Sequence, residues 1–466
     1  MGSALENQLH SNSAAVHSTY RTKSSGDRFK LKSYAYRVVA KEVSCVSKYF
    51  DRLVHVVNQK QSKIIPFIEF QSKVELNLEE LNTLNSSKGA SVFLLDGDIN
   101  HSTDIQKLLE ELGKIVDRKD RILAVLYNPY LKVVFKLMNF LRLRRGSIPE
   151  TFVSRSSLEV FAKLANLEVC RVQPLLYCPF RLLFLGPILN SLFRVLPGFK
   201  WFGLAAVATL RPLRFEKNKP SLTIVVPARN EAGNIDQVLL RLTNLESIPV
   251  QLIFIEGHSK DETWEKIQKT LSIYEGPFQI EAYKQTGVGK KNAVKEGFAR
   301  ATGELLTILD ADLTMPPELL VRFYNAYCEG KGDFINGSRL VYSMENGAMR
   351  FLNHLGNIFF AKALSFVTDT KLTDSLCGTK LLSRVHYSGV SRWCEDFGEL
   401  DPFGDFELIF PAATLGLGVI DVPIQYQART YGTTNISRFQ HGWQLLRMTC
   451  LGFLTVKMGR MPYSKL

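Results

Sequence analysis

Two aspartates, Asp310 and Asp312, stand one residue apart directly after the apolar residues 307–309. The apolar residues predict the end of a buried strand, so both carboxylates are expected on the turn that follows it. Two carboxylates on one turn can hold one side of a divalent cation and leave the other side open to phosphate oxygens. Pro316 and Pro317 then predict the start of a helix, where a missing N–H costs little. An acidic surface turn is the alternative, but the strand before the pair and the helix after it favour a metal–nucleotide site.

Two earlier predicted strands also end in polar residues. Residues 222–227 are apolar and largely β-branched, as in a strand inside a parallel sheet, and Asn230 and Glu231 follow them. Residues 250–255 form the next such strand and are followed by Glu256. Ligands of open α/β sheets bind at the carboxyl ends of the strands. We therefore expect these side chains to share one site with the two aspartates.

Lys290 and Lys291 open a predicted helix after the turn Gly287-Val288-Gly289. Their ammonium groups could reach a diphosphate held beside the aspartates, and a solvated helix start is the alternative. The turn lacks the third glycine of a dinucleotide-binding motif, and Gly-Lys-Ser/Thr is absent from the sequence. An NAD-dependent enzyme or a P-loop ATPase is therefore disfavoured.

These segments, in this order, resemble GT-A glycosyltransferases of family 2, most closely the dolichol-phosphate mannosyltransferase-like branch, across about 220–440. The family pattern is a Pro-x-x-Asn-Glu turn, an acidic-Gly-Ser-x-Asp turn, a Gly-Lys-x-x-Ala helix and Asp-Ala-Asp. At the second of these the chain reads Glu-Gly-His-Ser-Lys-Asp over 256–261. The resemblance implies an α/β, Rossmann-like nucleotide-diphospho-sugar transferase domain that holds Mg²⁺ or Mn²⁺ on Asp310 and Asp312. It also implies a nucleotide-sugar pocket lined by Pro227, Asn230, Glu231, Glu256, Lys290, Lys291 and Asp310.

Three later arginines, Arg339, Arg350 and Arg429, lie in segments that resemble phosphate-contacting segments of the family. The resemblance implies that they bind the acceptor, a polyprenyl phosphate. Guanidinium groups suit phosphate because they form paired, charge-assisted hydrogen bonds. The chain departs from the family pattern after Arg429, where Thr433 and Asn435 replace a glutamate and a lysine.

Asp405 is expected at the start of a helix, where many inverting relatives place a catalytic carboxylate, and Glu407 competes for that role. If the acceptor is a hydroxyl, Asp405 would be the general base. If the acceptor is a phosphate, already ionised at pH 7, no base is needed. An acid that only favours the helix N-terminus is a further alternative. Cys377 has no second Cys or His at zinc-ligand spacing and is expected in the core.

The N-terminal half alternates between predicted strands and helices from about residue 86. Strands are expected over 91–95, 121–127 and 168–173, and helices over 103–116 and 155–165. Such alternation predicts a parallel sheet.

This block resembles the C-terminal half of class I methyltransferases through Phe93-Leu94-Leu95-Asp96 and the later Asn128-Pro129. No glycine-rich turn precedes these residues, so the backbone cannot approach S-adenosylmethionine closely. We expect a smaller, degenerate methyltransferase-like α/β domain, structural or acceptor-binding, over 29–210. Residues 1–28 are a predicted disordered tail, 211–220 a linker and 221–466 the GT-A domain.

Positive charge is concentrated in the N-terminal half. The net charge is +13, and residues 131–214 hold thirteen Lys and Arg against three Glu, interleaved with apolar residues. A basic and apolar surface suits anionic lipid headgroups, and a solvated basic face is the alternative. Nucleic acid is disfavoured because no binding motif accompanies the charge. No apolar run is long enough to span a bilayer, which predicts peripheral attachment.

The N-terminus lacks the apolar core of a signal peptide, and the seven cysteines form no C-x-x-C pair, which together predict a cytoplasmic chain. Residues 464–466 match a peroxisomal Ser-Lys-Leu address, which has meaning only in a eukaryote. The sequence thus predicts a metal-dependent glycosyltransferase, inverting by analogy, that acts at the membrane surface on a nucleotide-sugar and a polyprenyl phosphate. The alternatives are a hydroxyl acceptor (a polysaccharide or a small molecule), a non-catalytic nucleotide-binding scaffold and, weakened by the missing glycine turn, an active methyltransferase.

Overall fold

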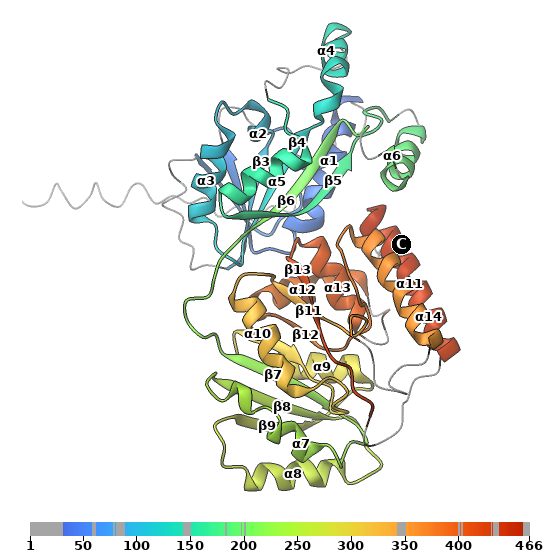
Figure 1. The fold of residues 1–466 in the computed structure, drawn as a ribbon. Coiled ribbons are helices and arrows are strands. Elements are labelled where there is room, and N and C mark those ends of the chain that lie inside the picture. Colours follow the sequence, from blue (N-terminus) through green and yellow to red (C-terminus); the bar gives the residue numbers. More distant parts are fainter. Residues whose placement is uncertain are drawn as a thin grey trace, which may run out of the picture.

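The computed structural model describes residues 31–57, 62–77, 80, 89–142, 151–181, 184–196, 198–199, 202–342, 351–398, 401, 404–429, 431 and 438–459. Within these residues the chain forms two sheets, the N-terminal one above the C-terminal one in Figure 1. Several predictions fall outside the described residues: the tail 1–28, Arg350, Thr433, Asn435 and the tripeptide 464–466.

The N-terminal sheet has six strands in the order β2-β1-β3-β4-β6-β5. Its strands are β1 (Arg52–Val57), β2 (Lys73–Asn77), β3 (Ser91–Asp96), β4 (Arg121–Tyr127), β5 (Leu167–Leu175) and β6 (Ala205–Pro212). Its helices are α1 (Leu31–Ser47), α2 (Asp98–His101), α3 (Ile105–Ile115), α4 (Lys132–Phe140), α5 (Arg155–Leu164) and α6 (Leu185–Val195), with 3-10 turns η1 (Ile65–Phe67) and η3 (Pro129–Leu131). β3 and β4 are almost entirely buried, as their near-continuous apolar sequences predict.

The strands and helices predicted between residues 91 and 173 are confirmed to within two residues at each end. The prediction of a purely parallel sheet is wrong, because β6 runs antiparallel to both of its neighbours, β4 and β5. Hydrophobic periodicity reports which faces of a strand are buried and not the direction in which the strand runs. β6 also continues to Pro212, so the predicted linker begins inside a strand.

The C-terminal sheet has seven strands in the order β13-β11-β12-β10-β7-β8-β9. They are β7 (Leu222–Ala228), β8 (Val250–Glu256), β9 (Gln279–Lys284), β10 (Leu305–Ile308), β11 (Phe334–Ser338), β12 (Lys380–Ser383) and β13 (Val419–Pro423). β12 is antiparallel to β10 and β11, and the other described pairings are parallel. The sheet is therefore mixed, whereas the alternation along the sequence had indicated parallel strands.

Helices cover both faces of this sheet. They are α7 (Ile235–Leu240), α8 (Thr263–Ile273), α9 (Lys290–Ala299), α10 (Leu320–Cys328), α11 (Phe351–Thr368), α12 (Arg384–Phe397), α13 (Asp405–Thr414) and α14 (Arg438–Gly452), with 3-10 turns η5 (Thr243–Leu245) and η6 (Pro317–Leu319) and the π-helical turn η7 (Phe453–Lys457). α9 can lie close to β7 because residue 297 is a glycine. A Cβ at this position would stand 2.4 Å from Val225 Cγ1. This close packing brings the first turn of α9 to the strand ends.

The two sheets share one hydrophobic core. A single cluster of buried side chains includes Val43 of α1, Leu123 of β4, Val225 of β7 and Phe410 of α13. In Figure 1, α12 and α13 lie directly below the N-terminal sheet. The N-terminal half is therefore packed onto the C-terminal half rather than tethered to it.

A buried carboxylate ties the two halves together. Asp333, just before β11, is fully buried and lies 2.7 Å from Arg121 Nη2, 3.0 Å from Arg118 Nε and 3.2 Å from Arg211 Nη1. Burial alone would raise the pKa of Asp333, but the three arginines hold it well below its usual range. All three belong to the N-terminal half, which explains part of the positive charge counted there: Arg211 neutralises an internal carboxylate and does not face solvent.

Among the helices of the described residues, none combines the length and the apolar character that crossing a bilayer requires.

Candidate active site

The parallel strands β7, β8 and β10 end at one edge of the C-terminal sheet. Ala228 of β7 pairs with Glu256 of β8, and Ile308 of β10 pairs with Val225 of β7, so the three turns that follow start at similar levels. The predicted nucleotide-binding and metal-binding residues lie on or next to these turns. The structure therefore places them along one edge, as the order of motifs suggested.

The turns after β7 and β8 are tied to each other. Asn230 has a left-handed backbone (φ 56°), a conformation that asparagine tolerates better than most residues. Its N–H donates to Ser259 Oγ at 3.0 Å, and its side-chain oxygen accepts from the N–H of Lys260 at 2.8 Å. Glu256 is buried and accepts from the N–H of Ser259 at 2.5 Å. Asn230 and Glu256 thus shape the pocket edge, while the side chain of Pro227 is half-buried at the end of β7.

Glu231 is a buried acid at the same edge. Its Oε1 lies 3.0 Å from Arg429 Nη1, and its Oε2 accepts from Asn234 Nδ2 at 2.7 Å. Burial raises the pKa of Glu231 to about 7, although Arg429 and Asn234 oppose the shift. The carboxyl therefore exchanges its proton close to neutral pH.

Asp310 and Asp312 each have a cationic partner. Asp310 Oδ1 lies 2.5 Å from Lys290 Nζ, and Asp312 Oδ2 lies 2.6 Å from Arg429 Nη2. Asp312 Oδ1 accepts from the N–H and the hydroxyl of Thr314 at 3.1 and 2.8 Å, which orients the carboxylate. The negative charge of the pair is thus balanced by a lysine and an arginine.

The donor set of this edge suits a hard divalent cation. Two carboxylates supply oxygen ligands, which Mg²⁺ and Mn²⁺ prefer, and Mg²⁺ is commonly held by one or two carboxylates plus phosphate oxygens. Within the described residues, no group of three or more His, Cys, Asp or Glu side chains could hold a metal on its own. Asp310 and Asp312 therefore suit one side of such a cation and leave its other positions open to further oxygen ligands.

Gly378 closes this part of the site. A Cβ at this position would stand 2.3 Å from Lys290 Nζ and 2.4 Å from Asp310 Oδ2. No side chain fits there without displacing Lys290 and Asp310. Gly378 thus lets the loop before β12 lie directly against the aspartate and its lysine partner.

The two predicted lysines diverge. Lys290 lies on Asp310, and although burial opposes its charge, Asp310, Asp405 and Asp312 raise the pKa of Lys290 above its usual value. Lys291 lies 2.5 Å from Glu407 of α13, so its ammonium group is directed away from the aspartates. Of the two, Lys290 is the one placed to reach a diphosphate at Asp310.

Asp405 begins α13, as predicted, and its Oδ1 accepts from Lys380 Nζ at 2.5 Å. Lys380 is completely buried and also donates to the carbonyl of Cys377. Such a partner holds the Asp405 carboxylate in one position. One oxygen of the Asp405 carboxylate is thus already engaged by an ammonium group.

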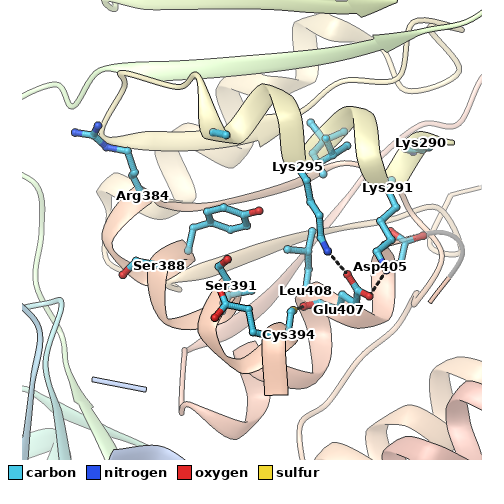
Figure 2. A pocket seen from close by; sticks show the side chains of 18 of the residues that line it. Lys290, Lys291, Lys295, Arg384, Ser388, Ser391, Cys394, Asp405, Glu407 and Leu408 are labelled. Atoms are coloured by element: carbon cyan, nitrogen blue, oxygen red, sulfur yellow. Dashed lines mark hydrogen bonds and ion pairs between the residues drawn. The ribbon is translucent and has the colours of Figure 1, made fainter. Parts of the chain in front are cut away.

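A cavity of about 550 Å³ extends from this part of the site between α9, α12 and α13. Lys290, Gly378 and Asp405 line it at the aspartate end, and Arg384 and Ser388 of α12 line it elsewhere. Figure 2 shows Lys291 and Lys295 directed towards Glu407, with Arg384 at the opposite side of the cavity.

The predicted acceptor arginines have different surroundings. Arg339 forms two hydrogen bonds to the buried Asp374, at 2.7 and 2.9 Å, and its guanidinium lies over the ring of Tyr426. Burial would lower the pKa of Arg339, but Asp374 raises it further above its usual value. Arg429 instead contacts Glu231 and Asp312 on the nucleotide side. The predicted role of all three arginines at the acceptor stays a prediction, and Arg350 lies outside the described residues.

Sequence reasoning missed three residues that shape the site: Lys380, Gly378 and Asp374. All three stand in the segment Asp-Ser-Leu-Cys-Gly-Thr-Lys at 374–380, and no pattern along the sequence shows which carboxylate each cation meets. Cys377 is buried, and burial raises the pKa of its thiol to about 11, which agrees with the predicted place in the core.

Comparisons with known proteins point to one family. The family described as Glycosyl transferase family 2 matches residues 223–389. The chain is 30% identical over 223 residues to a dolichol-phosphate mannosyltransferase of Pyrococcus furiosus, a match that covers 46% of this chain and 59% of that protein. It is 28% identical to a dolichyl-phosphate hexose transferase of Haloferax volcanii, over 47% of this chain and 89% of that protein.

The structural likeness is weaker. A glucosyl-3-phosphoglycerate synthase of Mycobacterium tuberculosis superposes with a TM-score of 0.37 and 18% identity, covering 53% of this chain and 82% of the other. A TM-score this low does not establish a shared fold. The chain also spans only 59% and 52% of the lengths of two curated relatives, the Pyrococcus enzyme and the hexosyltransferase Agl6 of Haloferax volcanii. The sequence match nevertheless covers most of the strand edge described above, and residues 223–389 of this chain are similar to the family described as Glycosyl transferase family 2.

Proposed function

We propose that this chain is a metal-dependent glycosyltransferase of the GT-A type that moves a sugar from a nucleotide-sugar to a polyprenyl phosphate. One observation carries the proposal: the strand edge that the family match covers brings together Asp310, Asp312 and two cationic side chains. The Pyrococcus relative is named a dolichol-phosphate mannosyltransferase and the Haloferax relative a dolichyl-phosphate hexose transferase, and these names support the acceptor class.

The donor would bind along the three strand ends. Asp310 and Asp312 would hold Mg²⁺ or Mn²⁺, which when bound neutralises the charge that develops on the leaving diphosphate. Lys290 stands beside Asp310 and adds a second positive charge at the same place. Asn230, Glu231 and Glu256 supply polar groups for the ribose and the base.

The environment of Asp405 favours a phosphate acceptor. In the proposed step an oxygen of the acceptor phosphate attacks the anomeric carbon of the sugar. The bond from that carbon to the nucleoside diphosphate breaks, and the diphosphate leaves with the electron pair. A phosphate oxygen carries no proton that must be removed, so Asp405, held by Lys380, can serve to position groups without acting as a base.

A hydroxyl acceptor is the second candidate. It would need a base, and both Asp405 and Glu407 border the cavity that adjoins the aspartate turn. Glu407 is nearly fully buried and, like Asp405, is already engaged by an ammonium group, here that of Lys291. A non-catalytic scaffold is less well supported, because both aspartates of the metal pair are present.

The N-terminal half would assist at the membrane surface. The proposed acceptor is a membrane lipid, so the catalytic edge must meet a bilayer. That this half is a degenerate methyltransferase-like domain with a structural or acceptor-binding role stays a prediction, and so does the cytoplasmic location.

A transfer assay tests the proposal. The full chain is incubated with Mn²⁺, a panel of radiolabelled nucleotide-sugars and either a short-chain polyprenyl phosphate or the matching polyprenol. We expect label in the organic phase only with the phosphate, together with release of the nucleoside diphosphate in equal amount. Transfer to the polyprenol at the same rate, or only to water-soluble hydroxyl acceptors, would overturn the lipid-phosphate part of the proposal.

A further inference from the structure

The helix α4 carries its apolar residues on the outside. Val133, Leu137 and Phe140 recur at helical spacing and therefore lie on one face, and all three are exposed, Phe140 to 83%. On the opposite side, Phe135 is buried and packs edge-on against the ring of Tyr127. A helix of a soluble protein ordinarily buries such a face, whereas none of the residues that the structure describes covers this face of α4.

The helix α6 repeats the arrangement. Leu185, Ile188 and Leu192 share one face and are all about half exposed, and Phe184, just before the helix, is 74% exposed. The inner side is fixed by Arg194, whose Nη2 lies 2.6 Å from Glu42 of α1. α6 is therefore anchored to the N-terminal half by a buried ion pair while its apolar face points outward.

The charges around these two helices have one sign. Lys132 and Lys136 are exposed on α4, Arg142 follows it, and Arg181 precedes α6, whereas neither helix contains an Asp or a Glu. The exposed helices α3, α5 and α8 of the same protein do contain acidic residues. Exposed apolar stripes beside lysines and arginines match the interface of an anionic bilayer, in which aliphatic and aromatic groups enter the acyl boundary and cations meet the headgroups.

The apolar surface continues beyond the N-terminal half. Arg171 of β5 donates to the carbonyl of Val456 in η7 at 3.3 Å, and η7 follows α14. α11 and α14, which pack on each other, expose Phe359 and Trp443 and also contain no acidic residue. In Figure 1, α6 lies on the same side of the molecule as α11 and α14, and α4 stands away from the sheet at the top.

We propose that α4 and α6 are membrane-surface helices, by which the N-terminal half docks on an anionic lipid bilayer. The choice of a bilayer over a protein partner rests in part on the proposed function, which requires a lipid acceptor. Two copies of this chain would bring cations against cations at such a face. Nucleic acid would leave the apolar stripes without cover. Helices of 9 and 11 residues are too short to cross a bilayer, for which roughly 20 are needed, so they would lie in its surface.

Vesicle sedimentation of the full chain tests the proposal. One variant carries Leu137→Ser and Phe140→Ser in α4, and a second carries Ile188→Ser and Leu192→Ser in α6. Because these side chains are exposed, the variants should fold, which thermal unfolding checks. The matched control is Leu240→Ser with Ile273→Ser, at positions that are 66% and 67% exposed on α7 and at the end of α8, at the far end of the molecule.

We expect the wild-type chain to bind phosphatidylcholine vesicles that contain about a third of an anionic lipid, and to bind pure phosphatidylcholine weakly. Each apolar variant should lower the partition coefficient roughly tenfold or more, whereas the control should match the wild type. Replacing Lys132 and Lys136 by Gln should lower binding to the anionic vesicles about fivefold per lysine, with no change on neutral vesicles.

Three results would overturn the proposal. The wild-type chain could fail to bind anionic vesicles, or the α4 and α6 variants could bind as well as the control. Alternatively, light scattering could show a dimer that the α6 variant dissociates, with vesicle binding unchanged, which would assign the face to a second copy. Binding of nucleoside diphosphates to the wild-type chain, measured without vesicles, separates this inference from the proposed enzyme function. If the wild-type chain binds anionic vesicles but no nucleoside diphosphate, the result counts against the enzyme function and not against the membrane-surface helices.

Discussion

Arg429 Nη2 lies 2.6 Å from Asp312 Oδ2, and the other terminal nitrogen of Arg429 lies 3.0 Å from Glu231 Oε1. The segment after β13 thus reaches across the strand edge and joins the turn after β10 to the turn after β7. Its guanidinium balances the same carboxylate that we assign to the divalent cation. Arg429 and a cation therefore compete for Asp312, and a bound cation would free the guanidinium for a phosphate.

Replacing Arg429 by Ala should have two opposite effects. Mn²⁺ should bind more tightly to the enzyme without nucleotide, because Asp312 loses its competing partner. The KM for a polyprenyl phosphate should rise roughly 10-fold to 150-fold, the equivalent of one charge-assisted hydrogen bond. Calorimetry gives the first quantity and steady-state kinetics the second. An unchanged acceptor KM would remove Arg429 from the acceptor site.

Replacing Asp405 by Asn distinguishes the two acceptor classes. With a phosphate acceptor no base is needed, so kcat should fall by less than about 10-fold, through loss of the contact with Lys380. With a hydroxyl acceptor, removal of the general base should lower kcat roughly 10²-fold to 10⁴-fold. The measurement is kcat on a polyprenyl phosphate at saturating donor. A drop of the larger size on this acceptor would contradict the positioning role.

Replacing Asp333 by Ala should strongly destabilise the chain. The change leaves Arg118, Arg121 and Arg211 buried without their shared carboxylate, and such a loss typically costs about 3–5 kcal/mol. As the control, Asp396→Ala removes a partly exposed partner of Lys48 and should cost no more than about 1 kcal/mol. Urea unfolding compares the two, and equal midpoints would show that the buried network does not hold the halves together.

His386 should make the fold sensitive to mild acid. Burial is the main reason that the pKa of His386 is lowered to about 3, and the positive charge of the nearby Arg121 adds to the effect. The ring therefore stays neutral in the folded chain. In the unfolded chain it takes up a proton near its usual pKa of about 6.5. The free energy of unfolding should therefore fall as the pH drops from about 6.5 towards 3.

The substitution His386→Gln tests this assignment. It removes the titrating ring, so the variant should lose less stability than the wild type between about pH 6.5 and 4. Asp333, whose pKa is lowered, contributes its own loss only below the usual range of an aspartate, which keeps the two windows apart. Parallel pH profiles for both chains would contradict a buried neutral His386.

The sequence predicted the elements that carry strong hydrophobic periodicity. Both faces of β3, β4, β7 and β8 are buried, so these strands are long apolar runs. Such runs can be recognised in the sequence alone. Residues 29–85 escaped prediction. α1 carries Glu42 in a buried position, where Arg171 and Arg194 neutralise it, and no local pattern announces a buried ion pair.

Residue types at the site were predictable, whereas their partners were not. The four motifs predicted that their polar side chains lie along one edge, because the carboxyl ends of parallel strands must meet. The pairing of Lys291 with Glu407 and of Lys380 with Asp405 depends on how α13 packs against α9 and β12. Those contacts join residues far apart in the chain, so spacing along the sequence carries no signal for them.

The most direct test of the account is calorimetric titration of nucleoside diphosphates into the full chain, with and without Mn²⁺. Asp310→Asn and Asp312→Asn are compared with the wild type, and Asp236→Asn, which removes a surface partner of Lys266, is the control. We predict that the wild type and the control bind one of UDP, GDP, ADP or CDP only with Mn²⁺, and that both site variants lose this binding at unchanged thermal stability. Tight binding by the site variants, or binding by the wild type that does not depend on Mn²⁺, would contradict the central claim.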